Sequence, residues 1–184
     1  FAEGQTMQYE QTGKEELGKG PIVLCLDQST SMRGEKDLQA KGFALALMSI
    51  ARKQKRDFAL IRFSTVAAKR EYKKGKITIE EMVDLATSFL YGGTSYVEPL
   101  KSALETINKS RFKKADIVFV TDGLASLTRG FLERFNDIKR EKEFSVVSIL
   151  IGKADMASWL EEFSDRVAVS SDLMDEKAHV AFEI

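Results

Sequence analysis

The sequence Pro21-Ile-Val-Leu-Cys-Leu-Asp-Gln-Ser-Thr-Ser-Met32 decides the fold that we expect for this chain. Its first half, 22–26, is a continuous apolar run, which is typical of a short strand buried on both faces. The run stops at Asp27, and oxygen-bearing side chains then occupy alternate positions, Asp27, Ser29 and Ser31. Carboxylate and hydroxyl oxygens suit a hard cation such as Mg²⁺, whereas zinc favours Cys and His. The stretch therefore indicates a buried strand that ends in a cation-binding loop.

Apolar runs alternate with helical patterns along the rest of the chain. Further strands are expected at 58–63, 66–72, 115–121, 144–151 and 166–169, and helices at 36–55, 78–89, 97–109, 129–142, 156–163 and from 172 onward. The run 66–72 alternates and is rich in Lys and Arg, which suits an edge strand. Because the other strands are mostly continuous apolar runs, we predict a Rossmann-like, three-layer α/β fold. Its mainly parallel six-stranded sheet has the order 3-2-1-4-5-6, one antiparallel edge strand, and helices on both faces.

Composition and length favour one globular domain with a short appendage. The chain has 184 residues, of which 43% are hydrophobic and 30% are charged. Lys+Arg and Asp+Glu both total 28, so the net charge is zero, which argues against a dedicated nucleic-acid or membrane-surface binder. Residues 1–19 are polar and contain several glycines, so we expect a linker, tail or edge strand there and the main domain at 20–184. No apolar stretch is long enough to span a bilayer.

Polar residues also follow two other apolar segments. Thr94 follows a Gly-Gly pair, and Asp122-Gly123 follows the strand that ends at Thr121. Each of these features alone is common as a helix cap or a turn. In the expected strand order, however, the first and fourth strands are neighbours, so Asp27 and Asp122 should face one crevice at the carboxyl edge of the sheet.

Together, these segments resemble the metal-ion-dependent adhesion site of von Willebrand factor A domains, and the resemblance extends from residue 20 to the end. It implies a bound Mg²⁺, or Mn²⁺ or Ca²⁺ as in some members. In this family, an acidic side chain of a protein partner typically completes the coordination of the ion. The resemblance assigns the metal ligands to the hydroxyls of Ser29, Ser31 and Thr94, and to the carboxylates of Asp27 and Asp122, which act directly or through water.

One branch of the family is resembled more closely. The segments 20–27 and 43–51 are similar to those of intracellular prokaryotic proteins of the ViaA-like and CoxE-like group, which partner a MoxR-type AAA+ ATPase. This resemblance implies a cytoplasmic, non-enzymatic adaptor for such an ATPase or its substrate. Thr30 is a departure, because the family usually has a small residue there, commonly Gly. Arg33 and Tyr96 lie beside the metal loops, and we expect them to contact the acidic group of the partner.

An alternative is a haloacid-dehalogenase-like, Mg²⁺-dependent phosphatase with Asp27 as its nucleophile. That family needs a second carboxylate two residues later as the general acid, and this chain has Ser29 there. Serine hydrolysis is less compatible with the sequence, because there is no Gly-x-Ser-x-Gly motif and His179 is the only histidine. No dinucleotide or P-loop motif is present. A scaffold that has lost metal binding is a third interpretation, although every expected ligand type is present.

Overall fold

The structure is a computed structural model that describes residues 20–123 and 125–170. Its strands are β1 (Ile22–Asp27), β2 (Phe58–Phe63), β3 (Ala67–Tyr72), β4 (Asp116–Thr121), β5 (Val146–Ile151) and β6 (Arg166–Ser170). Within the described residues they form one six-stranded sheet in the order β3-β2-β1-β4-β5-β6. β3 pairs antiparallel with β2, and all other neighbours are parallel. The predicted sheet topology, including the antiparallel edge strand, is confirmed.

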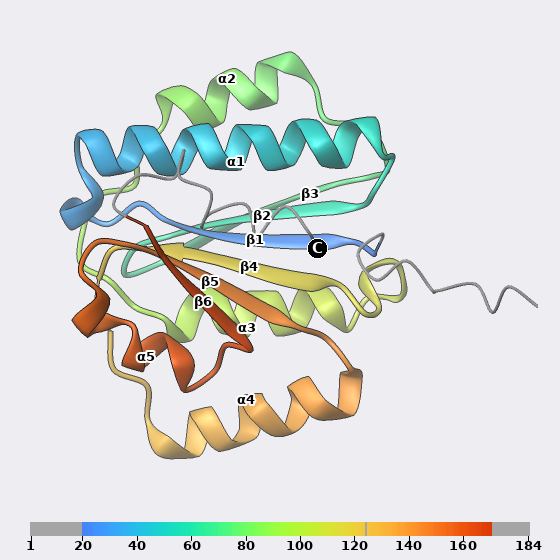
Figure 1. Cartoon of the computed structure of the whole chain (residues 1–184). Coiled ribbons are helices and arrows are strands. Elements are labelled where there is room, and N and C mark those ends of the chain that lie inside the picture. The colour runs from blue at the N-terminus through green and yellow to red at the C-terminus, as the bar shows by residue number, and fades with distance from the viewer. Residues whose placement is uncertain (1–19, 124, 171–184) are drawn as a thin grey trace, which may run out of the picture.

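Helices cover both faces of this sheet, which gives the predicted three layers (Figure 1). The helices are α1 (Glu35–Lys53), α2 (Ile79–Thr87), α3 (Val97–Ile107), α4 (Arg129–Lys142) and α5 (Ser158–Glu161). α1 lies over one face, with α2 packed on its outer side, and α3, α4 and α5 lie on the opposite face. Each face has its own cluster of buried apolar side chains, so the sheet is sandwiched between two cores.

The central strand β1 contributes to both cores. Ile22, Leu24 and Leu26 belong to the core beneath α1, whereas Val23 and Cys25 belong to the core beneath α3. All of them are fully buried, and full burial of one large apolar side chain contributes about 1.5–3 kcal/mol. Burial raises the pKa of the Cys25 thiol, so this cysteine acts as a packing residue. The two-sided burial explains why this segment of the sequence has no polar alternation.

The helices differ from expectation in their bounds and in their exposed residues. α1 begins after Gly34, whose φ of 93° favours glycine, and it ends at Lys53 instead of Lys55. Leu38 is apolar, yet 72% of its surface is exposed, so it lies on a side of α1 that neither the sheet nor α2 covers.

Near the end of the described chain, the helix expected at 156–163 is reduced to a 3-10 turn followed by the four-residue helix α5. Trp159, which lies in α5, is 43% exposed. The preceding strand begins at Val146, two residues later than position 144. The expected appendage at 1–19 and the helix from 172 onward lie outside the described residues. In the part of the chain that the structure describes, no helix is long and apolar enough to cross a membrane.

A capping box opens α2. Thr78 Oγ1 accepts a hydrogen bond from the Glu81 amide at 3.2 Å, and the Glu81 carboxylate accepts one from the Thr78 amide at 2.8 Å. We predict that Thr78→Ala lowers the free energy of unfolding by about 1 kcal/mol, because the helix loses its cap. Urea denaturation measures this change.

Thr87→Ala is the matched control, because its hydroxyl donates back to the Val83 carbonyl within the same helix at 2.9 Å. This hydrogen bond does not pair any of the free amide groups at the amino end of the helix. The control should therefore change the free energy of unfolding by less than about 0.5 kcal/mol. Equal losses in the two variants would contradict a capping role for Thr78.

Candidate metal centre

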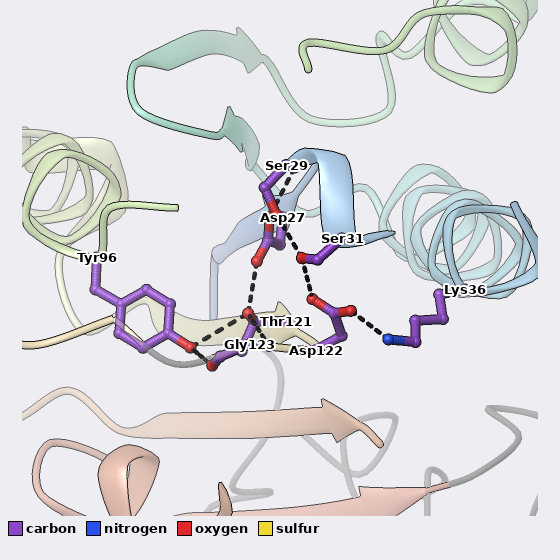
Figure 2. A network of polar contacts seen from close by, with 8 residues as sticks. All are labelled: Asp27, Ser29, Ser31, Lys36, Tyr96, Thr121, Asp122 and Gly123. Carbon is purple, nitrogen blue, oxygen red and sulfur yellow. Dashed lines mark hydrogen bonds and ion pairs between the residues drawn. The ribbon is translucent and has the colours of Figure 1, made fainter. Parts of the chain in front are cut away.

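The candidate site lies where β1 and β4 end side by side. Leu26 is in register with Val120, so Asp27 and the Thr121-Asp122 pair leave the same edge of the sheet together. Figure 2 shows their side chains joined in one polar network. This placement follows from parallel pairing, which brings the carboxyl ends of neighbouring strands to one edge.

Asp27 forms the buried floor of the site. Its side chain is 0% exposed, and its two oxygens accept hydrogen bonds from the Ser29 amide at 2.8 Å and from Thr121 Oγ1 at 2.6 Å. Burial raises the pKa of Asp27, the hydrogen bonds from Thr121 and Ser29 offset part of this rise, and the nearby charge of Asp122 adds to it. The ionised carboxylate therefore costs free energy, and a bound cation would lower that cost.

Hydroxyl groups connect this floor to the surface. Ser29 is 1% exposed, and its Oγ lies 3.1 Å from Ser31 Oγ. Ser31 is exposed and donates to Asp122 Oδ1 at 2.8 Å. The other oxygen of Asp122 pairs with Lys36 Nζ at 2.5 Å. The polar contacts thus connect the buried Asp27, through Ser29 and the exposed Ser31, to Asp122 and Lys36 (Figure 2).

Gly123 lies between the hydroxyls of Ser31 and Thr94. A Cβ built at Gly123 would make ordinary van der Waals contact with both, at 3.9 Å from Ser31 Oγ and 4.0 Å from Thr94 Oγ1, so both hydroxyls face this glycine. Thr94 is half-buried, and the next residue anchors its loop to the end of β2, because the Ser95 amide donates to the Ser64 carbonyl at 2.9 Å. Side chains from three separate loops therefore converge on one small region.

Thr30, the departure from the family pattern, joins two of these loops. Its amide donates to the Gly92 carbonyl at 2.9 Å, and its Oγ1 accepts from the Gly92 amide at 3.1 Å. Gly92 has a φ of 94°, a conformation that side chains rarely adopt. The hydroxyl of Thr30 thus fixes the loop that carries Thr94 against the loop that carries Ser29 and Ser31.

The two residues expected to contact a partner have different environments. Arg33 is exposed at the end of the 3-10 turn Thr30–Met32, and its role stays a prediction. Tyr96 is only 1% exposed, and its hydroxyl donates to the Gly123 carbonyl and lies 3.3 Å from Thr121 Oγ1. This burial contradicts the expectation that Tyr96 contacts a partner. Burial also raises the pKa of Tyr96, so its hydroxyl remains a neutral donor beneath the site.

Sequence reasoning assigned no role to two residues of this network. Thr121 bridges Asp27 and Tyr96, and its hydroxyl also accepts from the Gly123 amide at 3.2 Å. Lys36 pairs with Asp122 across a gap of 86 positions in the chain. The available signal for Lys36 was its position, because a cation in the first turn of a helix opposes the helix dipole.

The donor set fits a hard divalent cation. Its potential ligands are carboxylate and hydroxyl oxygens, which Mg²⁺ and similar ions prefer. Among residues 20–123 and 125–170, no three His, Cys, Asp or Glu side chains gather where they could hold a metal. A cation at this edge would therefore depend on the hydroxyls of Ser29, Ser31 and Thr94 as well as on the two carboxylates.

The fold and the sequence define the family of this chain. Residues 22–124 match the model of the von Willebrand factor type A domain, and the chain belongs to this family. The chain aligns with the structure of proximal thread matrix protein 1 from the mussel byssus with a TM-score of 0.66 at 16% identity. That structure is described as having zinc in its metal-ion-dependent adhesion site (MIDAS) motif. That alignment covers 90% of this chain and 47% of the mussel chain, and it supports the fold.

Two curated relatives are similar in sequence. An uncharacterized protein of Methanocaldococcus jannaschii is 32% identical over 185 residues, which cover 100% of this chain and 42% of that protein. The regulatory protein ViaA of Proteus mirabilis is 29% identical over 129 residues, covering 70% of this chain and 26% of ViaA. The chain thus spans less than half the length of each of these relatives.

Tyr96 should stabilise the site from below. We predict that Tyr96→Phe lowers the free energy of unfolding by about 1–3 kcal/mol, because the Gly123 carbonyl loses the hydrogen bond from the buried tyrosine hydroxyl. Thermal or urea unfolding without added metal measures the change.

Tyr91→Phe is the matched control, because Tyr91 is 56% exposed and loses the same atom. It should change the free energy of unfolding by less than about 0.5 kcal/mol. A loss at Tyr96 no larger than that at Tyr91 would contradict the supporting role.

Proposed function

We propose that this domain binds a divalent cation, with Mg²⁺ as the favoured ion. Through this ion it would bind an acidic side chain of a protein partner. The convergence of Ser31 and Thr94 on Gly123, near the carboxylates of Asp27 and Asp122, is the observation that carries this proposal. Ser29 completes the set of proposed ligands. When bound, the cation would supply a Lewis-acidic position that accepts an oxygen from outside the chain.

Coordination number and exposure support an outside oxygen ligand. The proposed ligands are two carboxylates and three hydroxyls, which leave at least one position of an octahedral ion for an oxygen from an acidic side chain of the partner. Ser31 is exposed at the rim, while Asp27 is inaccessible at the floor, so an incoming group would approach from the Ser31 side. Arg33 is exposed beside this rim, and we propose that it contacts the same partner.

The geometry disfavours the phosphatase alternative. A nucleophilic Asp27 would need a free, accessible oxygen, but this side chain is 0% exposed and both oxygens accept hydrogen bonds. Ser29, two residues later, cannot replace the carboxylic acid that would protonate a leaving group. We therefore propose a binding module and not an enzyme.

The partner class follows from similarity to ViaA. ViaA is described as a regulatory protein, and the segments 20–27 and 43–51 resemble the group that works with MoxR-type AAA+ ATPases. We propose that the protein containing this domain is a cytoplasmic adaptor for such an ATPase or for a substrate that the ATPase remodels.

Metal binding should appear as a gain in stability. At about one hundred times its dissociation constant, Mg²⁺ should raise the free energy of unfolding by about 2.7 kcal/mol if it binds only the folded chain. Asp27→Asn keeps the shape of the side chain but removes its charge, so this gain should largely disappear. Thermal unfolding in EDTA and in a Mg²⁺ series measures the effect.

Asp155→Asn is the control, because this residue lies in the 3-10 turn Ala154–Met156, outside the network, and loses the same charge. It should retain the full gain. No stabilisation of the parent by Mg²⁺, Mn²⁺ or Ca²⁺ would contradict the metal site. If the cation binds but the domain retains a purified MoxR-type ATPase equally in Mg²⁺ and in EDTA, the metal does not bridge the two proteins. In that case the bridging role is wrong while the metal site stands.

A further inference from the structure

Lys36 occupies a position that the helix itself does not favour. It lies in the first turn of the 19-residue helix α1, between the acidic residues Glu35 and Asp37. The amino end of a helix carries partial positive charge, so a lysine there is disfavoured while its acidic neighbours are favoured. The positions three and four residues later, Gln39 and Ala40, supply no carboxylate for a pair along the helix. A reason for this lysine has to come from outside α1.

That reason is Asp122. Lys36 Nζ lies 2.5 Å from Asp122 Oδ2, and the Asp122 side chain is only 2% exposed. Asp122 Oδ1 is already bonded to Ser31 Oγ at 2.8 Å, so the two oxygens of this carboxylate are shared between a hydroxyl and an ammonium group (Figure 2). A buried carboxylate without such partners would be costly, so Lys36 stabilises the site from within the chain.

We propose that Lys36 is a built-in competitor of the divalent cation for Asp122, and that it thereby sets the metal affinity of the site. This inference rests on the proposed metal-binding function. With Asp27 and Asp122 ionised, a divalent cation alone neutralises their charge, which leaves the ammonium of Lys36 without compensation and repelled by the ion. The Lys36 side chain is 45% exposed, so its ammonium can move into water when Asp122 turns to another cation.

Lys36→Met tests the competition, because it keeps much of the aliphatic length and removes the charge. We expect the Mg²⁺ dissociation constant, measured by calorimetric titration, to fall at least about tenfold relative to the parent. In EDTA the variant should melt at a lower temperature, because Asp122 loses its ion pair. In saturating Mg²⁺ this deficit should shrink or reverse, since the ion then compensates the carboxylate.

Lys53→Met is the matched control. Lys53 lies in the last turn of the same helix, and no ion pair of its side chain occurs among the described residues. Its loss removes the same charge, so any change in melting temperature should be equal in EDTA and in Mg²⁺. Lys36→Arg keeps the positive charge and should bind Mg²⁺ with nearly the affinity of the parent.

The outcomes separate this inference from the proposed function. If the parent binds Mg²⁺ and Lys36→Met binds it no more tightly, the competition is overturned while the metal site stands. An equal loss of stability with and without Mg²⁺ would show a purely structural lysine and would also overturn it. If neither protein binds a divalent cation, both proposals fail. Tighter binding in Lys36→Met alone supports the competition even if binding to the parent is too weak to detect.

Discussion

The hydrogen bond from Thr121 Oγ1 to Asp27 Oδ2, 2.6 Å long, holds the candidate site together. It joins the ends of β1 and β4, two strands that are far apart in sequence and adjacent in the sheet. Both residues are fully buried, so neither oxygen can exchange this contact for water. The hydroxyl of Tyr96 lies beneath the same threonine, and the Ser29 amide occupies the other oxygen of Asp27. The positions of the loops above depend on this buried contact.

The site also places two carboxylates close together in a buried environment, where an ionised carboxylate is costly. Burial and the neighbouring charge of Asp122 both raise the pKa of Asp27, and hydrogen bonds relieve only part of this cost. Lys36 provides further relief at Asp122 from α1, the helix that follows the loop. Lys36 contacts Asp122, one of the two buried carboxylates, so the negative charge of the pair is compensated only in part. This incomplete compensation is the physical basis of the proposed metal binding and of the proposed competition.

The sequence was sufficient to predict the layers, the strand order and the edge that carries the polar loops. The continuous apolar run before Asp27 has a direct physical cause, since its side chains fill cores on both faces of the sheet. Local patterns were less informative about which side chains would be exposed. Leu38 and Trp159 have apolar character but lie on helix faces that no other element covers among the described residues. No local rule distinguishes such a face from a packed one.

Contacts between distant loops were also beyond prediction. Thr30 was identified only as an unusual residue, yet it bonds to Gly92 through both its amide and its hydroxyl. Tyr96 was expected to contact a partner because it lies beside the metal loops, but its hydroxyl donates to the Gly123 carbonyl and its side chain is buried. In both cases the partner is more than twenty-five residues away along the chain, so local spacing carried no signal for the contact.

A crystal structure of the chain grown with Mn²⁺, with anomalous diffraction recorded at the manganese edge, would show whether this edge of the sheet binds a cation. We expect one strong anomalous peak in contact with the hydroxyl oxygens of Ser29, Ser31 and Thr94, near Asp27 and Asp122. In that state Lys36 Nζ should have moved away from Asp122. A peak only at another place, or no peak at this edge of the sheet at saturating Mn²⁺, would contradict cation binding by these residues.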